Sequence, residues 1–323
     1  MPTTILKIMF VGAHLEARLP FEHLAATNEN IVGLFTLTPE ALGRMSGGID
    51  LTGLAKAANI PVRTGTNLNA PETLAWVKTL APDLLLVVGW TQLLKSELLA
   101  IPRIGCLGFH ASLLPKYRGR APVNWAILNG ETETGNTMMV LEPGADEGDI
   151  VSQRRIPIGE QDDCKTIYEK VSLTECEMLD EVLPLIREGR LPRVKQDSGA
   201  ATVMPKRKPE DGLLDWRWPS RRLYNWVRAL THPYPGAFGY LCGRKVTIWK
   251  ACLDANSRPI DEPAGSVHLS SDGFPLVNAG DNGALKLLQV EREGHSSVSG
   301  VEAGQTFLKP PAAFQTDLVE VAV

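Results

Sequence analysis

The chain has 323 residues, of which 44% are hydrophobic and 22% charged. This composition is typical of a folded globular protein, excludes a disordered or fibrous chain, and at this length predicts two domains. The formal net charge of -4 at pH 7 provides no overall basic field for a long polyanion, which argues against a dedicated nucleic-acid-binding protein but leaves room for a local basic patch.

The first predicted element is the short apolar run from Ile5 to Val11, which Lys7 interrupts. It is followed by His14 and Glu16 rather than by a small-residue cleavage site. The run therefore predicts a first strand and not a signal peptide or a membrane span. We expect a cytoplasmic protein with no membrane partner.

Short apolar runs then alternate with amphipathic segments as far as about Gly189. The predicted strands are Ile5–Val11, Ile31–Leu37, Leu84–Val88 and Ile104–Phe109, and the predicted helices between them are Leu51–Ala58, Pro71–Leu80 and Leu93–Leu99. Continuous hydrophobicity suits strands that are covered on both faces, as in a parallel sheet built from βαβ units. The fold class is therefore α/β, with an open, mostly parallel sheet flanked by helices.

A long predicted helix, about Lys165 to Glu188, ends this first domain, and the small polar segment from Gln196 to Thr202 has the composition of a linker. Beyond it the pattern changes to a short helix and closely spaced strands, with a tight turn at Cys242-Gly243-Arg244; the helix is Arg221–Leu230 and the strands are Phe238–Leu241 and Val246–Ala251. We expect an α/β domain over residues 1–200 and a β-rich domain over residues 201–323.

His110 follows an apolar strand, where the carboxyl end of the sheet would present it to a ligand crevice. A further strand, Thr137–Leu141, leads into a loop that bears Asp146, Glu147 and Asp149. A carboxylate close to an imidazole orients it for general acid and base catalysis. The residues alone leave a second interpretation open, in which His110 is a hydrogen-bonded structural histidine and the acidic loop is solvated.

Other kinds of site find little support in the sequence. The segment after the first strand, Val11-Gly-Ala-His-Leu-Glu16, lacks the G-x-G-x-x-G fingerprint of a nicotinamide-binding protein. No H-E-x-x-H motif or paired ligand spacing occurs, and the five cysteines form no C-x-x-C pair. We expect no metal, and reduced, buried thiols.

Three motifs together resemble a known family. They are His-x-Ser-Leu-Leu-Pro-x-x-Arg-Gly beginning at His110, Gly-Glu-x-x-x-Gly beginning at Gly130, and Asp-x-Gly-Asp beginning at Asp146. The pattern is similar to that of the formyltransferases that depend on N10-formyltetrahydrofolate. It is dense from Ile104 to Ile158, and Lys208–Trp216 and Pro233–Phe238 extend it into the second domain.

This resemblance implies an α/β domain that binds formyl-folate, followed by a smaller β-barrel similar to the oligonucleotide-binding fold. It implies N10-formyltetrahydrofolate as co-substrate, His110 as catalytic histidine and Asp146 as its carboxylate. By the same resemblance the pterin would contact two loops, through Val88, Gly89, Trp90, Leu93 and Leu94 and through Glu142, Gly144 and Ala145. Four further residues are candidates for substrate binding: Ser112, Leu114, Arg118 and Trp125.

These substrate-binding candidates have structural alternatives. Ser112 lacks the context of a nucleophilic serine, and with Leu114 it more simply shapes the loop beside the histidine. Arg118 either binds an anion or forms a buried ion pair. The rings of Trp90 and Trp125 either stack on a ligand or belong to the core.

The sequence departs from the family pattern at Gly108, where the usual motif Asn-x-His has an asparagine that binds the formyl oxygen. Glycine has no side chain to donate, so the oxyanion would rely on His110, backbone amides or water. Three explanations are open: impaired transfer, hydrolysis of formyl-folate with water as acceptor, or folate binding without catalysis. A fourth is that Gly108 only relieves strain at the strand end.

For the acceptor, the run Arg-Gly-Arg-x-Pro-x-Asn-Trp from Arg118 to Trp125 is similar to enzymes that formylate nucleotide-linked amino sugars. The second half of the chain has nearly equal numbers of acidic and basic residues, which disfavours a tRNA site. We therefore expect transfer to the primary amine of a nucleotide-linked amino sugar. The alternatives are a formyl-folate hydrolase and a methionyl-tRNA formyltransferase, and a homodimer is compatible with each.

Overall fold

The computed structural model describes residues 5–254 and 262–316, and the chain divides into two compact units. The first unit comprises residues 1–123, 133–158 and 166–206. The second comprises residues 124–132, 159–165 and 207–323. The second unit thus takes in two segments from the amino-terminal half of the chain, and the domain boundary expected at residue 200 stays a prediction.

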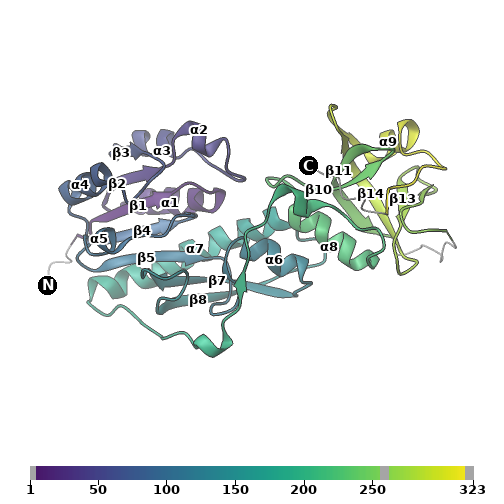
Figure 1. The fold of residues 1–323 in the computed structure, drawn as a ribbon. Coiled ribbons are helices and arrows are strands. Elements are labelled where there is room, and N and C mark those ends of the chain that lie inside the picture. Colours follow the sequence, from purple (N-terminus) through teal and green to yellow (C-terminus); the bar gives the residue numbers. More distant parts are fainter. Residues whose placement is uncertain (1–4, 255–261, 317–323) are drawn as a thin grey trace. The chain divides into compact units, whose positions relative to one another are not determined.

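The first unit is built on a seven-stranded sheet in the order β3-β2-β1-β4-β5-β7-β8 (Figure 1). Its strands are β1 (Ile8–Gly12), β2 (Ile31–Thr36), β3 (Val62–Thr64), β4 (Leu84–Val88), β5 (Gly105–His110), β7 (Glu133–Val140) and β8 (Ile150–Pro157). Strands β1 to β5 are parallel to one another, β7 is antiparallel to β5, and β8 is antiparallel to β7. The predicted open, mostly parallel sheet is confirmed.

Helices connect and flank these strands (Figure 1). They are α1 (Arg18–Ala26), α2 (Pro39–Leu42), α3 (Thr52–Ala57), α4 (Pro71–Leu80), α5 (Ser96–Leu99), α6 (Pro122–Leu128) and α7 (Cys164–Arg187), with one 3-10 turn, η1 (Leu15–Ala17), after β1. Helix α5 begins later than the predicted Leu93, because Asn69 accepts from the Lys95 amide and donates to the Leu93 carbonyl. No helix in the described ranges is long and apolar enough to span a membrane.

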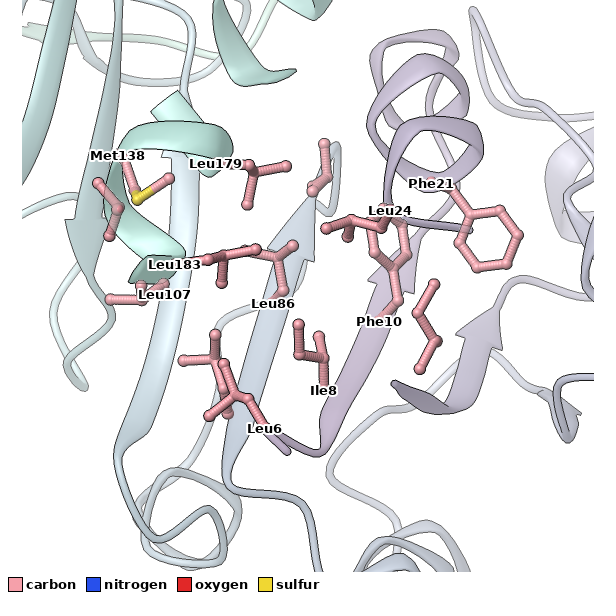
Figure 2. Packing of buried hydrophobic residues seen from close by; sticks show 14 of the residues in the cluster. Leu6, Ile8, Phe10, Phe21, Leu24, Leu86, Leu107, Met138, Leu179 and Leu183 are labelled. Carbon is pink, nitrogen blue, oxygen red and sulfur yellow. The ribbon is translucent and has the colours of Figure 1, made fainter. Parts of the chain in front are cut away.

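Strand β1 is apolar throughout because both of its faces are covered. Figure 2 shows Ile8 and Phe10 packing on one face with residues of α1 and α7, among them Phe21, Leu24 and Leu183. On the other face, the next residues along β1 pack with α4 and the 94–99 segment. A strand buried on two sides needs this continuous hydrophobicity, which explains why the sequence pattern located it.

The second unit is an antiparallel β domain that also contains helices, among them most of α6. Its elements are η3 (Pro209–Gly212), α8 (Ser220–Leu230), β10 (Ala237–Leu241), β11 (Arg244–Leu253), β12 (Val267–Leu269), β13 (Pro275–Asn278), β14 (Ala284–Arg292), β15 (Ser297–Ser299) and α9 (Gly300–Thr306). The predicted tight turn joins β10 to β11, and both Cys242 and Gly243 have positive φ, as a two-residue hairpin requires.

The segment 312–315 connects the two edges of this sheet. The Gln315 amide donates to the Tyr240 carbonyl of β10, and the Val267 amide of β12 donates to the Ala312 carbonyl, each at 2.9 Å. Because one segment binds both edge strands, the sheet has the closed, barrel-like arrangement expected for the second domain.

Candidate active site

The candidate site lies at the carboxyl ends of three neighbouring strands, β1, β4 and β5. The chain leaves β1 toward β2 on one side and leaves β4 toward β5 on the other, which makes this edge a topological switch point. Gly12 pairs with Val88, and Val87 pairs with Gly108. Gly89 follows the end of β4, and His110 is the end of β5.

His110 is the last residue of β5 and is 8% exposed. Its Nε2 lies 2.7 Å from the backbone oxygen of Tyr117, and because a carbonyl only accepts, Nε2 carries the proton in this contact. Nδ1 lies 3.6 Å from Oδ1 of Asp146. A proton added to the ring would therefore face the carboxylate.

Asp146 is fixed from several sides. Its backbone is left-handed, with φ of 57°, and Oδ2 accepts from the Gly119 amide at 2.8 Å. The Gln196 side-chain amide donates to the carbonyls of Asp146 and Gly148, both at 2.8 Å. The structure thus brings together the two residues predicted as catalytic, and their roles stay predictions.

The loop after β5 is held by its own polar side chains. Ser112 is fully buried, and its hydroxyl donates to the Lys116 carbonyl at 2.7 Å. Thr137 donates to the Ser112 carbonyl, and Gln153 donates to the carbonyl of Leu114. Ser112 and Leu114 therefore have structural partners, and a direct role in substrate binding stays a prediction for both.

Arg118 is buried and contacts protein groups. Its Nη2 donates to Oε1 of Gln196 at 2.8 Å, and Nη1 lies 3.7 Å from Glu147. Arg118 and Gly119 form the short strand β6, which pairs in parallel with β9 (Val203–Met204). Two interpretations of Arg118 were left open, anion binding and a buried ion pair. The structure supplies an anionic partner within the chain, Glu147.

The segment from Gln196 to Thr202 is not a free linker, which corrects the interpretation of its composition. Besides the contacts of Gln196, the Thr202 hydroxyl accepts from the Tyr117 amide at 2.8 Å. Small polar residues suit linkers, but they also supply the donors and acceptors that hold a neighbouring loop. Gln196 and Thr202 are supporting residues that the sequence pattern did not reveal.

Gly108 lies two residues before His110, on the same face of β5. A Cβ built at Gly108 would lie 2.7 Å from Cδ2 of Leu141. The leucine side chain therefore occupies the space into which a side chain at position 108 would extend. Cys106, again two residues earlier, is no substitute nucleophile, because burial raises the pKa of its thiol to about 12.

The loop predicted to contact the pterin follows β4. Gly89 adopts φ of 59°, Leu94 is buried and Leu93 is exposed. The Trp90 ring packs edge-on against Phe35 at 5.6 Å, and within the described residues its buried Nε1 has no hydrogen-bond acceptor. An unpartnered indole N–H beside a crevice fits a ligand that offers oxygen or nitrogen acceptors, as a folate does.

The second predicted pterin loop lies between β7 and β8. Glu142 and Ala145 are exposed, Gly144 is half-buried, and a Cβ at Gly144 would meet the Glu147 carboxylate. Backbone groups here are accessible to a ligand, and the binding role stays a prediction. In the described part of the chain, no three His, Cys, Asp or Glu side chains gather in a way that could hold a metal.

Trp125 belongs to the second unit, together with the preceding Asn124. The Asn124 amide is buried and donates to the Ala229 carbonyl at 2.6 Å. The guanidinium carbon of Arg207 lies 5.0 Å from the centre of the Trp125 ring and 5.1 Å from that of Trp226. The Asn-Trp pair therefore has a packing role inside the second unit.

Comparisons with known proteins give consistent matches over most of the chain. A model described as formyl transferase matches residues 21–183, and one described as formyl transferase, C-terminal domain, matches residues 206–307. A methionyl-tRNA formyltransferase of Geobacter metallireducens is 36% identical over 296 residues, which is 91% of this chain and 93% of that protein.

Solved structures share the fold at lower identity. HypX from Aquifex aeolicus in complex with tetrahydrofolic acid has a TM-score of 0.66 at 18% identity; the match covers 95% of this chain but spans only about half of HypX, 48%. The N-formyltransferase from Helicobacter canadensis in complex with folinic acid and dTDP-3-aminofucose also has a TM-score of 0.66, at 17% identity, over 87% of this chain and 98% of that one.

The expected acceptor, a nucleotide-linked amino sugar, is wrong. Five curated relatives that are 33–42% identical over 70–92% of the chain are methionyl-tRNA formyltransferases, whereas the sugar N-formyltransferases are structural matches below 25% identity, which show the fold alone. The Asn-Trp pair on which this expectation rested makes packing contacts in the second unit. The expected one-carbon transfer chemistry and formyl-folate co-substrate are confirmed.

Proposed function

Because the chain belongs to the formyltransferase family, we propose that it transfers the formyl group of N10-formyltetrahydrofolate to the amino group of methionyl-tRNA. The observation that carries the proposal is the identity to methionyl-tRNA formyltransferases over about nine-tenths of both chains. The adjacent His110 and Asp146 support it with chemistry suited to acyl transfer.

The folate would bind at the carboxyl edge of the sheet. Trp90 offers an indole N–H without a partner in the described chain, and Gly89 lets the backbone of this loop pass close to His14, where a Cβ would lie 2.7 Å from the His14 Cβ. The accessible backbone of residues 142–145 would contact the opposite side of the pterin. The co-substrate supplies the activated formyl group; the protein has to bind it and move protons.

In the proposed reaction, the acceptor nitrogen forms a bond to the formyl carbon, and the bond from that carbon to N10 breaks. The acceptor amine loses one proton and N10 gains one. His110 already holds a proton on Nε2, which it donates to the Tyr117 carbonyl. A formyl oxygen that replaces this carbonyl would receive the same hydrogen bond, which is the stabilisation that position 108 cannot give.

Asp146 would help to accept the proton that the amine loses. Its Oδ2 accepts from the Gly119 amide, which leaves Oδ1 facing Nδ1 of His110. A proton taken up by Nδ1 would meet this carboxylate, so the ring can pass one proton on and receive another. Anchoring by the Gly119 amide keeps the carboxylate aligned while the proton moves.

Product analysis tests the proposal. The purified chain is incubated with formyltetrahydrofolate, with and without methionyl-tRNA, and formylmethionyl-tRNA and free formate are measured together. We expect formylmethionyl-tRNA as the main product. Formate in place of formylated tRNA would instead establish a hydrolase, and folate binding without either product would establish a binding protein.

A further inference from the structure

Helix α7 carries a carboxyl group in the protein interior. Glu175 is fully buried, and neither of its carboxyl oxygens has a hydrogen-bond donor among the described residues. An ionised carboxylate in such surroundings is strongly destabilised, so Glu175 requires either a proton or an unrecorded partner. The formyl-transfer mechanism proposed above makes no use of it.

Two neighbours of Glu175 have the same deficiency. Oε2 of Glu16, in the η1 turn after β1, and Oδ1 of Asn136, in β7, are both buried and lack a donor. Both residues contact α7 near Glu175, because the Ser172 hydroxyl donates to the Glu16 carbonyl and the Asn136 amide donates to the Thr174 hydroxyl. Burial, and then the charge of Glu16, raises the pKa of Glu175 well above its usual range, although Asn136 opposes this shift. A single proton on Glu175 supplies the missing donor.

Glu16 connects this pair to the crevice. A Cβ built at Gly89 would lie 3.1 Å from Oε1 of Glu16, so this oxygen lies against the backbone that follows β4. Gly89 follows the last residue of β4, and His110 is the last residue of the neighbouring strand β5, so both lie at the carboxyl edge of the sheet. The Glu16 side chain is 13% exposed. Its carboxylate thus contacts the loop that follows β4, at the carboxyl edge of the sheet, while Glu175 is fully buried.

We propose that Glu16 and Glu175 share one proton, and that the negative charge left on Glu16 binds the cationic amino group of the acceptor beside His110. Glu175 is then a positioning residue, whose hydrogen bond holds the Glu16 carboxylate against Gly89. This inference rests on the proposed function, because it takes the acceptor to be a primary amine. An α-amino group has an ordinary pKa of about 7.7–8.0 and so arrives largely as a cation at neutral pH. The bound cation releases one proton to solvent before its nitrogen attacks, and the second proton is the one that the proposed reaction transfers.

Titratable groups near the pair include Cys176, which lies next to Glu175 on α7, and His14, whose ring contacts Tyr168. Nδ1 of His14 lies 3.7 Å from Oε2 of Glu16, and the Tyr168 ring lies edge-on to the His14 ring at 4.9 Å. Ser172 fixes the turn, because its hydroxyl donates to the backbone oxygen of Glu16.

Steady-state kinetics with three variants test the proposal. Glu16→Gln removes the charge, Glu175→Gln imitates the protonated carboxyl, and Glu175→Met keeps the volume without a donor. We expect Glu16→Gln to raise KM for methionyl-tRNA about tenfold or more, with KM for formyltetrahydrofolate unchanged. Glu175→Met should raise the same KM, and Glu175→Gln should restore most of it. An unchanged KM in Glu16→Gln, or equal damage from Gln and Met at 175, would overturn the proposal.

A binding measurement separates this inference from the proposed function. Titration calorimetry compares methioninamide, which has a free amino group, with N-acetylmethioninamide, which has none. We expect the wild type to bind the free amine at least about tenfold more tightly, and Glu16→Gln to abolish the difference. If the wild type discriminates but does not formylate methionyl-tRNA, the proposed function fails and the amine site stands. If it does not discriminate, the amine site is disproved.

Discussion

Single atoms around His110 decide what the site can do. The Tyr117 carbonyl requires a proton on Nε2, and Asp146 faces Nδ1, so both ring nitrogens are engaged in the structure. A substrate must replace the Tyr117 contact to reach the ring. The family motif identified His110 and Asp146, but the contact with Tyr117 could not be predicted, because it depends on how the loop after β5 turns back.

The first prediction concerns Gly108 and Leu141. We expect Gly108→Asn alone to lower the free energy of unfolding by about 1–3 kcal/mol, because its Cβ would overlap the leucine side chain. Adding Leu141→Ala should restore part of this stability and let the carboxamide raise the transfer rate. Urea unfolding and initial rates measure the two effects. A double variant no faster than Leu141→Ala alone would show that the missing carboxamide does not limit transfer.

The second prediction concerns the pH dependence of stability at Glu175. In the unfolded chain this carboxyl titrates near its ordinary value of 4.5, and in the folded chain its pKa is raised. Stability is therefore lost as pH rises above 4.5 toward the folded pKa, by about 1.4 kcal/mol per pH unit for one proton. Glu175→Gln does not titrate, so its advantage in Tm over the wild type should grow from pH 5 to pH 8. A difference in Tm independent of pH would contradict the shared proton.

At the scale of elements, strands of the first unit were predicted where burial is two-sided and missed where it is not. Strands β1 and β4 are apolar along their whole length, whereas β3 is short and partly exposed and the edge strand β8 contains polar residues. The hydrophobic pattern of β3 and β8 is weak because one side of each strand faces solvent. The segment from Gln196 to Thr202 was misjudged because composition does not say which loop it will bind.

The third prediction tests that segment. Gln196→Ala removes the amide that binds Arg118 and the carbonyls of Asp146 and Gly148. We expect the free energy of unfolding to fall by about 1–3 kcal/mol, because a buried guanidinium loses its acceptor. Transfer should fall about tenfold as the Asp146 loop loosens. Lys195→Ala, at the exposed neighbouring residue, is the matched control. Equal transfer rates in the two variants would show that Gln196 does not support the site.

At the scale of the whole molecule, the second unit depends on two segments from the amino-terminal half of the chain. Arg228 in α8 donates to the carbonyls of Gly159 and Asp162, both at 3.0 Å, and the Tyr224 hydroxyl donates to the Glu160 carbonyl. Residues 124–132 contribute the Asn124 contact to the same helix. Sequence order concealed this arrangement, since only the fold shows which unit a segment joins.

The fourth prediction follows from these contacts. A fragment of residues 207–323 lacks every one of the partners supplied by segments 124–132 and 159–165. It should unfold at a lower temperature than the second unit does within the full chain, or fail to fold cooperatively, because buried polar groups of α8 lose their acceptors and donors. Circular dichroism melting of the fragment against the full chain provides the measurement. Coinciding transitions would show that the segments are dispensable.

Formyl transfer at the His110 and Asp146 centre is tested most directly by following the formyl group itself. Formyltetrahydrofolate labelled with ¹⁴C in the formyl group is mixed with methionyl-tRNA and either the wild type or His110→Ala, and label on the tRNA is counted over time. We predict label on the methionyl amino group with the wild type and a rate at least about 100-fold lower with the variant. Label that stays off the tRNA, or equal labelling by both proteins, would contradict formyl transfer to methionyl-tRNA at the His110 and Asp146 centre.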